Sequence, residues 1–154
     1  TGIAIMHSRI LDYIPEGFSD IIDILLNIIK QGEETITGYV INGYAWADIG
    51  TISDYLQTHR LILSYKIPLI DRRLIPDEPF FIGPDSVIER DVTFKGFVSI
   101  GRNCVVKSCS TIEDAIIWDN TVIPENSVLK NAVAGNGWQV SLDYEGKAHI
   151  RLLE

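Results

Sequence analysis

The sequence is poor in the residue types that make covalent or metal cross-links. Its 154 residues include only two cysteines and three histidines, and Cys104 and Cys109 have no histidine nearby to complete a zinc site. We therefore interpret them as buried, reduced thiols rather than as a disulfide. A chain of this length can bury a hydrophobic core without such links.

Long apolar runs and basic runs are also missing. The most apolar stretch, residues 21–29, is interrupted by Asp23 and Asn27, so no segment is suited to span a bilayer. The formal net charge is −8 without any Lys/Arg-rich run, which argues against nucleic acid and anionic membranes as partners. We recognise no signal peptide and expect a cytoplasmic protein. Because Thr1 opens directly into an apolar run, we expect a chain that starts within a domain.

Three segments before residue 50 have the pattern of β-strands. Residues 2–7 are a short apolar run opened by glycine, which is typical of a buried strand. Residues 35–41 and 44–49 are joined by Asn42-Gly43, and both central positions of a type I′ turn require the positive φ angles that these residues tolerate. The pattern therefore predicts a β-hairpin after the first strand.

Helix signals separate and follow these strands. A short helical turn is expected over residues 9–13, capped by Ser8. Residues 20–30 carry isoleucine and leucine at helical spacing and predict an amphipathic helix. Thr51 is the natural N-cap of a further helix, and Asp54, three residues later, completes a pattern like a capping box.

A proline-rich segment divides the chain. Residues 66–81 contain Pro68, Pro76 and Pro79, which prevent a regular helix or a central strand. We interpret this segment as a linker between a first domain, residues 1–65, and a second region of different character.

From residue 82 onward, apolar residues recur at every sixth position. This period is the signature of hexapeptide repeats in a parallel β-helix, and it gives about three coils over residues 82–133. The phase slips by one residue after Ile112, and each apolar residue is followed four positions later by a small or β-branched one. The two series are Ile82, Ile88, Phe94, Ile100, Val106, Ile112, Ile117, Ile123 and Leu129, and Ser86, Val92, Val98, Cys104, Ser110, Ile116, Thr121, Ser127 and Val133.

A sandwich of short antiparallel strands is the alternative to a β-helix, since six is a multiple of the strand period of two. The β-helix is favoured because so many apolar matches in one register are improbable by chance. A left-handed coil would break the usual right-handed crossover rule, so that rule does not fix the handedness. Residues 134–154 predict a hairpin that caps the last coil, because a solenoid needs a protected end.

One segment of the first domain has the residue types of a ligand site. Trp46 and Asp48 lie two positions apart on the expected strand, so both side chains point to the same face. They leave the end of that strand just before a helix, which is where α/β sheets place ligands. A carboxylate there suits Mg²⁺, which takes one or two protein carboxylates together with substrate phosphates. The alternative is structural: Asp48 caps a turn and Trp46 fills the core.

The run Trp46-Ala47-Asp48-Ile49-Gly50-Thr51 resembles the end of the catalytic domain in sugar-1-phosphate nucleotidyltransferases, such as mannose-1-phosphate guanylyltransferases. Residues 1–3, residues 11–15 and the hexapeptide region around residues 115–119 also resemble this family, in matching order. The resemblance implies a remnant of the Rossmann-like α/β domain over residues 1–65, followed by an all-β left-handed parallel β-helix. It also implies that the chain is the carboxy-terminal part of such an enzyme.

The resemblance further implies roles for three residues. Asp48 matches an aspartate that helps to bind the catalytic Mg²⁺, Trp46 would lie beside the sugar, and Gly2 would lie near the sugar phosphate with its backbone N–H. The implied partners are an NTP and a sugar-1-phosphate, which react to an NDP-sugar and pyrophosphate, with the metal neutralising charge. The sequence does not specify which sugar and which base.

Two other functions are compatible with hexapeptide repeats. Acyltransferases with such repeats typically use a histidine as general base, but His7, His59 and His149 all lie outside residues 82–133. A non-catalytic assembly module is the second alternative, and we expect a homo-oligomer in which the β-helix supplies flat contact faces. The aromatic residues that could line such a face are Phe80, Phe81, Phe94, Phe97 and Trp118.

We expect this chain alone to be catalytically inactive. It contains no G-x-G-T-R sequence, the loop with which this family cradles the nucleotide phosphates through backbone N–H groups. Incubation with Mg²⁺, an NTP and a hexose-1-phosphate should release no pyrophosphate above the background of a coupled assay. Turnover by the purified chain would show that this expectation is wrong.

Overall fold

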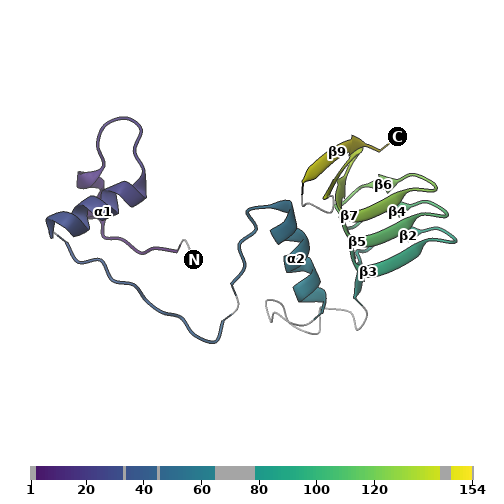
Figure 1. The fold of residues 1–154 in the computed structure, drawn as a ribbon, viewed down its shortest axis with the longest axis horizontal. Helices are drawn as coiled ribbons and strands as arrows, with labels where there is room; N and C mark the ends of the chain where they lie inside the picture. Colours follow the sequence, from purple (N-terminus) through teal and green to yellow (C-terminus); the bar gives the residue numbers. More distant parts are fainter. Residues whose placement is uncertain (1–2, 33, 45, 65–78, 143–146, 154) are drawn as a thin grey trace. The chain divides into compact units, whose positions relative to one another are not determined.

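The structure is a computed structural model that describes residues 3–32, 34–44, 46–64, 79–142 and 147–153. The chain forms two compact units, Thr1–Trp46 and Ala47–Glu154 (Figure 1). Among the described residues, neither unit contains a helix with the length and apolar character needed to cross a membrane.

The first unit contains two short helical elements. The 3₁₀ helix η1 (Ser8–Tyr13) is capped by His7, whose Nδ1 accepts a hydrogen bond from the Arg9 N–H, rather than by Ser8 as expected. Helix α1 (Ile21–Gln31) confirms the predicted amphipathic helix. The Asp20 carboxylate accepts from the Ile22 N–H at 2.7 Å, and Gly32 ends the helix in the left-handed conformation.

The strands expected over residues 2–7, 35–41 and 44–49 are not formed in the parts of these ranges that the structure describes. Alternating sequence alone does not make a strand, because a strand is stable only when its backbone groups pair with a neighbour. Ile5 and Tyr39 accordingly remain 100% and 90% exposed. The expected Rossmann-like sheet is therefore not visible in this unit.

The second unit begins with a capped helix that the sequence predicted. Helix α2 (Ile52–Leu63) follows Thr51, whose hydroxyl accepts from the Asp54 N–H at 3.1 Å and lies 2.7 Å from the Asp54 carboxylate. The first contact satisfies a backbone donor that the first turn leaves open, and in the second the Thr51 hydroxyl donates to the carboxylate, so the pair resembles half of a capping box.

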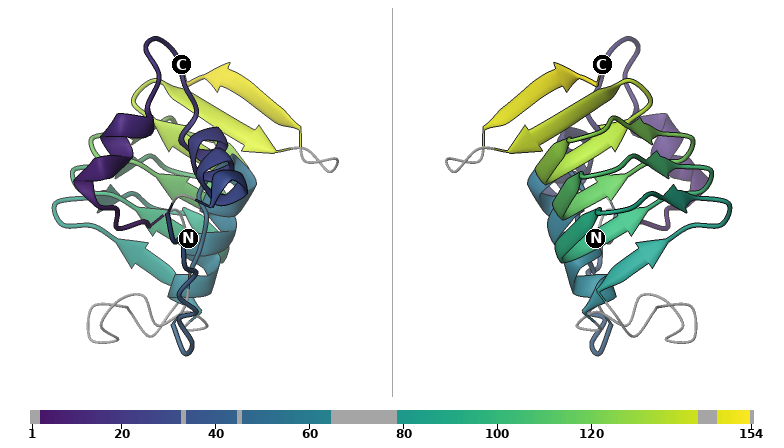
Figure 2. Two further views of the ribbon diagram at one scale, coloured as in Figure 1. Left: turned by 90° about the vertical axis from the view of Figure 1, so that its left-hand side faces the viewer. Right: turned by 90° about the vertical axis from the view of Figure 1, so that its right-hand side faces the viewer.

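The rest of this unit is a parallel β-helix of about three coils, in agreement with the prediction and consistent with a left-handed coil (Figures 1 and 2). Corresponding strands of successive coils stack in parallel, with a spacing of 18 residues from Phe81 to Ser99 and of 17 from Ser99 to Ile116. The strands are β1 (Phe80–Ile82), β2 (Val87–Ile88), β3 (Thr93–Ile100), β4 (Val105–Val106), β5 (Thr111–Ile117), β6 (Val122–Ile123) and β7 (Val128–Gly135).

The first coil starts earlier than the sequence indicated. Phe80 and Phe81 pair with Val98 and Ser99, so the expected linker over residues 66–81 ends before Phe80. The proline-rich residues 66–78 lie outside the described residues. The sequence pattern included Phe80 in the linker because Pro79, one of the prolines that define the linker, directly precedes it.

Inward-facing side chains fill the coil in stacked columns. From the second coil on, the first predicted series is almost completely buried, whereas Ile82, at the open start of the first coil, is 44% exposed. Cys104, Ser110 and Thr121 of the second series are fully buried as well. The buried members of the first series are Ile100, Val106, Ile112, Ile117, Ile123 and Leu129.

The predicted phase slip lies at one corner of the coil. Strands β3 and β5 are in register up to Lys95 and again from Val98 onward. Between these points Gly96 and Phe97 of β3 face the single residue Asp114 of β5, so the coil that contains Asp114 is one residue shorter at this corner. The slip is thereby confirmed as a local deletion.

The second predicted series is wrong at Ile116 and Val133, which do not point into the coil. Ala115, which pairs with Val98, and Ala132, which pairs with Ala115, take the inward positions instead. A shift of one residue moves side chains to the opposite face of a strand, which explains the error. Ile116 and Val133 are nevertheless buried, because α2 covers them.

An antiparallel hairpin follows the last coil, as predicted. Strands β8 (Trp138–Leu142) and β9 (Ala148–Leu152) extend the sheet beyond β7. Leu153 packs against the core of the coil, which closes its end. The turn of the hairpin, residues 143–146, lies outside the described residues.

The corners of the coil require left-handed backbone conformations. In the part of the chain that the structure describes, eight non-glycine residues have positive φ angles between 45° and 61°. Seven are Asp or Asn, which tolerate this region, and the eighth is Cys109, an exposed thiol rather than the buried one expected. The seven are Asp85, Asp91, Asn103, Asp114, Asn120, Asn126 and Asn131.

Cys109 is therefore a weak point of the coil. Replacing Cys109 by Asn should stabilise the protein by about 1 kcal/mol, because Asn adopts a positive φ more readily than cysteine. The change is measurable as a higher urea midpoint at an unchanged slope. Asn126 occupies the equivalent corner one coil later with a φ of 59°, so Asn126→Cys should be destabilising by a similar amount. Equal midpoints for all three proteins would contradict this account of the corners.

Candidate functional site

Asp48 lies at the surface of the second unit, directly before α2. Its side chain is exposed, and its Oδ1 lies 3.7 Å from the position that a Cβ on Gly50 would occupy. Among the described residues, no cluster of three or more His, Cys, Asp or Glu side chains could hold a metal ion. Asp48 thus offers one carboxylate, which can serve as a partial ligand set together with phosphate oxygens and water.

Trp46 belongs to the first unit and Asp48 to the second, so each is described by itself. Trp46 closes the first unit and is 59% exposed, so it does not fill a core as the structural alternative assumed. Gly2 lies outside the described residues. The proposed roles of all three residues therefore remain predictions.

The first unit contains a cavity of about 580 Å³. Its lining comes from the extended residues 3–7, from η1 and α1, and from residues 34–41. Leu25 and Ile28 of α1 contribute apolar surface, while His7, Arg9 and Glu34 contribute polar groups. Arg9 and Glu34 form an ion pair at 3.2 Å, so this rim is held together by charge as well as by packing.

Helix α2 lies along the outer face of the β-helix that β3, β5 and β7 form (Figures 1 and 2). Leu56 and Leu63 are buried against Phe97, Ile116 and Val133. These two leucines are one and three turns into the helix, so the contact runs along its length. The first turn of α2 also takes part, through side chains that are partly buried against the same cluster: Ile52 and Tyr55.

Arg60 adds a charged contact to this apolar surface. One nitrogen of its guanidinium lies 3.2 Å from Oδ1 of Asp114, a corner residue of the β-helix. The same guanidinium lies over the ring of Phe97, 5.4 Å from its centroid, in a cation–π contact. Sequence reasoning missed this pair because Arg60 and Asp114 are far apart in the chain, and only the phase slip at Asp114 marked that corner as unusual.

The aromatic residues considered for an assembly face separate into two groups. Phe97 is buried under α2, and Phe80 and Phe94 pack on the core of the coil with their rings 5.5 Å apart. Phe81 and Trp118 remain 38% and 46% exposed. Trp118 makes an edge-to-face contact with the partly buried side chain of Trp138, at 5.0 Å between centroids.

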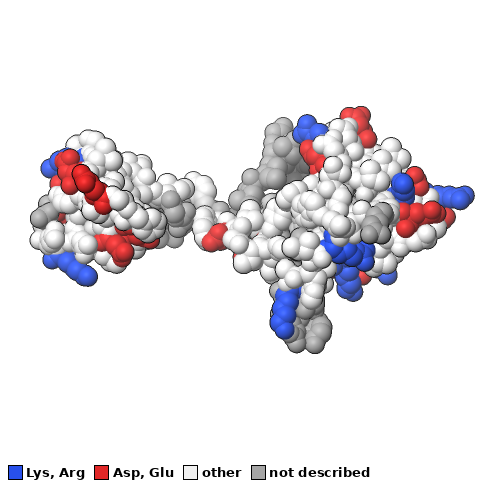
Figure 3. Space-filling view, turned by 90° about the horizontal axis from the view of Figure 1, so that it is seen from above, with Lys and Arg blue, Asp and Glu red and all other residues white. Residues whose placement is uncertain are grey.

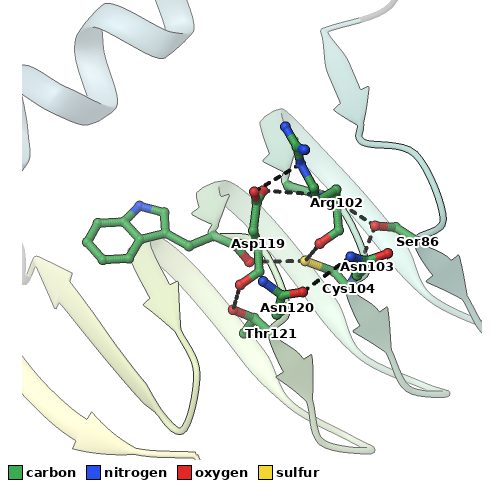
Figure 4. Close-up of polar contacts among 9 residues, drawn as sticks. Ser86, Arg102, Asn103, Cys104, Asp119, Asn120 and Thr121 are labelled. Carbon is green, nitrogen blue, oxygen red and sulfur yellow. Dashed lines mark hydrogen bonds and ion pairs between the residues drawn. The ribbon is translucent and has the colours of Figure 1, made fainter.

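A network of polar contacts at another corner holds successive coils together (Figure 4). The Asp119 carboxylate accepts from the Arg102 backbone N–H at 2.9 Å and pairs with its guanidinium at 3.1 Å. The buried Cys104 thiol donates to the Trp118 carbonyl at 3.0 Å, and the Ser86 hydroxyl accepts from the Cys104 N–H at 2.9 Å. These contacts satisfy backbone groups at the corner, so Cys104 and Asp119 have a structural role.

Charged side chains of both signs are interspersed over the β-helix unit on the face that Figure 3 shows. Lys130 and Glu113 pair at 2.8 Å, and this contact lowers the pKa of the Glu113 carboxyl and raises the pKa of Lys130. Hydrogen bonds from the Ser108 hydroxyl and backbone N–H lower the pKa of Glu89. Exposed contacts of this kind contribute little to stability.

His59 belongs to α2, the helix that packs on the β-helix. Its Nδ1 lies 3.2 Å from the Tyr55 carbonyl oxygen, and its ring meets the Tyr55 ring edge-on at 4.6 Å. Burial lowers the pKa of His59 from its ordinary value near 6.5, because the charged imidazolium loses water contacts.

The stability of the protein should therefore fall on acidification below about pH 6.5, where the unfolded chain takes up a proton at position 59 before the folded chain does. His59→Phe keeps a ring beside Tyr55 and cannot titrate. Urea unfolding at pH 7.5 and at pH 5.5 should show a smaller loss of stability for this variant than for wild type. An equal loss in both proteins would indicate that His59 is not the group responsible.

The comparisons with known proteins identify the β-helix. Residues 81–114 match the family described as bacterial transferase hexapeptide (six repeats). The chain is 27% identical over 142 residues to a UTP–glucose-1-phosphate uridylyltransferase from Synechocystis sp., an alignment that covers 77% of this chain and 36% of that protein.

Two further relatives match a shorter region. The bifunctional protein GlmU of Enterococcus faecalis is 39% identical over 75 residues, which cover 49% of this chain and 15% of that protein. The bifunctional protein GlmU of Marinobacter nauticus is 41% identical over 59 residues, covering 38% of this chain and 13% of that protein. The chain thus spans about a third or less of the curated relatives that it matches. It carries a hexapeptide-repeat β-helix, and over most of its own length it is similar to an enzyme named for uridylyl transfer to glucose-1-phosphate.

Proposed function

We propose that this chain is the carboxy-terminal part of a sugar-1-phosphate nucleotidyltransferase, which converts an NTP and a sugar-1-phosphate to an NDP-sugar and pyrophosphate. One observation carries the proposal. The segment from Trp46 to Thr51 leads directly into the capped helix α2, and α2 is packed on a hexapeptide-repeat β-helix. The alignment with a UTP–glucose-1-phosphate uridylyltransferase extends over 77% of the chain, which supports the same order of parts.

Asp48 is the residue that would bind Mg²⁺ in the complete enzyme. Its exposed carboxylate is a hard oxygen ligand, and the chemistry of this group fits a cation that retains water and phosphate ligands. Bound Mg²⁺ would neutralise the negative charge that develops on the transferred phosphoryl group. Trp46, which is 59% exposed, would supply a flat apolar surface for the sugar, and the backbone N–H of Gly2 would contact its phosphate.

The β-helix would serve assembly in a cytoplasmic homo-oligomer. The exposed side chains of Phe81 and Trp118 favour this role, because large aromatic groups at a surface are typical of protein interfaces. A non-catalytic assembly module is the second candidate function, supported by the same two residues. Acyl transfer receives no such support, since the three histidines of the sequence lie outside the repeats.

The metal assignment can be tested on the chain itself. Titration with Mg²⁺, followed through the amide signals of residues 47–51 by NMR, should shift these signals in the wild-type chain. Asp48→Asn should weaken the apparent affinity by about tenfold or more, because the amide oxygen carries no charge to balance the cation. The added Asn should not disturb the fold, since Asp48 is exposed.

Asp91→Asn is a matched control. Asp91 is also exposed, and its φ of 59° at a coil corner suits Asn as well as Asp. This variant should bind Mg²⁺ as wild type does. Identical titrations for wild type and Asp48→Asn would remove Asp48 from the metal site.

A further inference from the structure

The outer face of the β-helix presents a carboxylate, that of Asp114, to helix α2. Asp114 has a φ of 48°, and its Oδ1 accepts a hydrogen bond from the Phe97 backbone N–H at 3.2 Å. Its carboxylate lies over Gly96, which has a φ of 63°, and a Cβ at this position would meet Oδ1 and displace the carboxylate. The coil itself therefore fixes this carboxylate, whether or not an arginine is present.

Arg60 contacts this face of the β-helix through two residues, Asp114 and Phe97. Its guanidinium approaches Asp114 Oδ1 from α2 at 3.2 Å and lies over the Phe97 ring at 5.4 Å. Asp114 keeps 23% of its side chain exposed and Arg60 keeps 47%, so the pair is at the rim of the apolar contact. The hydrophobic effect is not directional, so apolar burial alone does not fix the orientation of α2. The planar guanidinium between a carboxylate and an aromatic ring makes directional contacts, which favour one orientation.

The position of α2 determines the position of the segment that precedes it. Only three residues separate Asp48 from the first helical residue, and Thr51 is tied to the first turn through Asp54. Ile52, in that first turn, packs on the β-helix as well. A shift of α2 along the sheet would therefore carry Asp48 with it.

We propose that Arg60 is a positioning residue: its contacts with Asp114 and Phe97 fix α2 on the β-helix and thereby hold the Asp48–Thr51 segment in one orientation. The purpose of that orientation, the presentation of Asp48 to a metal ion, rests on the proposed function. The mechanical connection does not, because it follows from the contacts of α2 alone.

Amide hydrogen exchange, resolved by NMR, tests this connection. Arg60→Met keeps the long apolar side chain and removes the charge, so Thr51 and the amides of α2 should exchange about three- to tenfold faster than in wild type. Arg60→Lys keeps a charge without the planar group and should give an intermediate rate. The amide signals of Asp48 and Gly50 should shift or broaden in Arg60→Met.

Arg102→Met is the control, because it removes an ion pair of similar length, 3.1 Å to Asp119, at another corner of the same β-helix. Its α2 amides should exchange as in wild type. Unchanged exchange in Arg60→Met would overturn the proposal. An equal acceleration of the amides of β3, β5 and β7 would also overturn it, because it would indicate a general loss of stability.

The same samples separate this proposal from the metal assignment. If Arg60 positions Asp48 for a cation, Arg60→Met should weaken the Mg²⁺ response by about three- to tenfold and Arg102→Met should not. Absence of a Mg²⁺ response in wild type would reject the proposed metal site, while the exchange rates would still decide the role of Arg60. Faster exchange in α2 with unaltered signals from Asp48 and Gly50 would reject the positioning role.

Discussion

The stacking of each inward side chain on its counterpart one coil away is the constraint on which the rest of the second unit depends. Ile100, Ile117 and Ala134 stack in one such column, and all three are almost completely buried. Because every coil repeats the same cross-section, outward side chains also fall into rows. The outer face of the β-helix is therefore a flat and rigid surface, in contrast to the first unit, whose extended residues form no sheet in the described structure.

One departure from this regularity lies beside the contact with α2. The coil is one residue shorter at Asp114, and beyond that corner Ile116 stacks on Ser99 and Val133 stacks on Ile116, on the side of the sheet that α2 covers. An apolar strip then lies on the outside of the sheet, next to a carboxylate that the corner holds above Gly96.

Local and periodic features could be predicted from the sequence, whereas features that depend on distant partners could not. The repeat, its phase slip and the cap at Thr51 involve residues that are near in sequence or regularly spaced. The strand expected over residues 35–41 did not form, since a strand requires a partner that its own sequence does not specify. For the candidate site, the sequence singled out Asp48 but could not indicate that Arg60 and Asp114 would meet across the sheet.

Apolar packing and the ion pair contribute different things to the contact. Leu56 and Leu63 supply most of the free energy, because buried apolar area contributes roughly 25 cal/mol per Å². The amount of buried area does not by itself distinguish one position along an apolar strip from another, so the ion pair adds a preference for one position that the area term lacks. A partly exposed ion pair adds only about 1 kcal/mol, yet it is lost when the two charges separate by a few ångströms. The weaker interaction thus contributes directly to the register, and the Asp48–Thr51 segment, which begins four residues before the first residue of α2, depends on Arg60 as well as on the larger apolar surface.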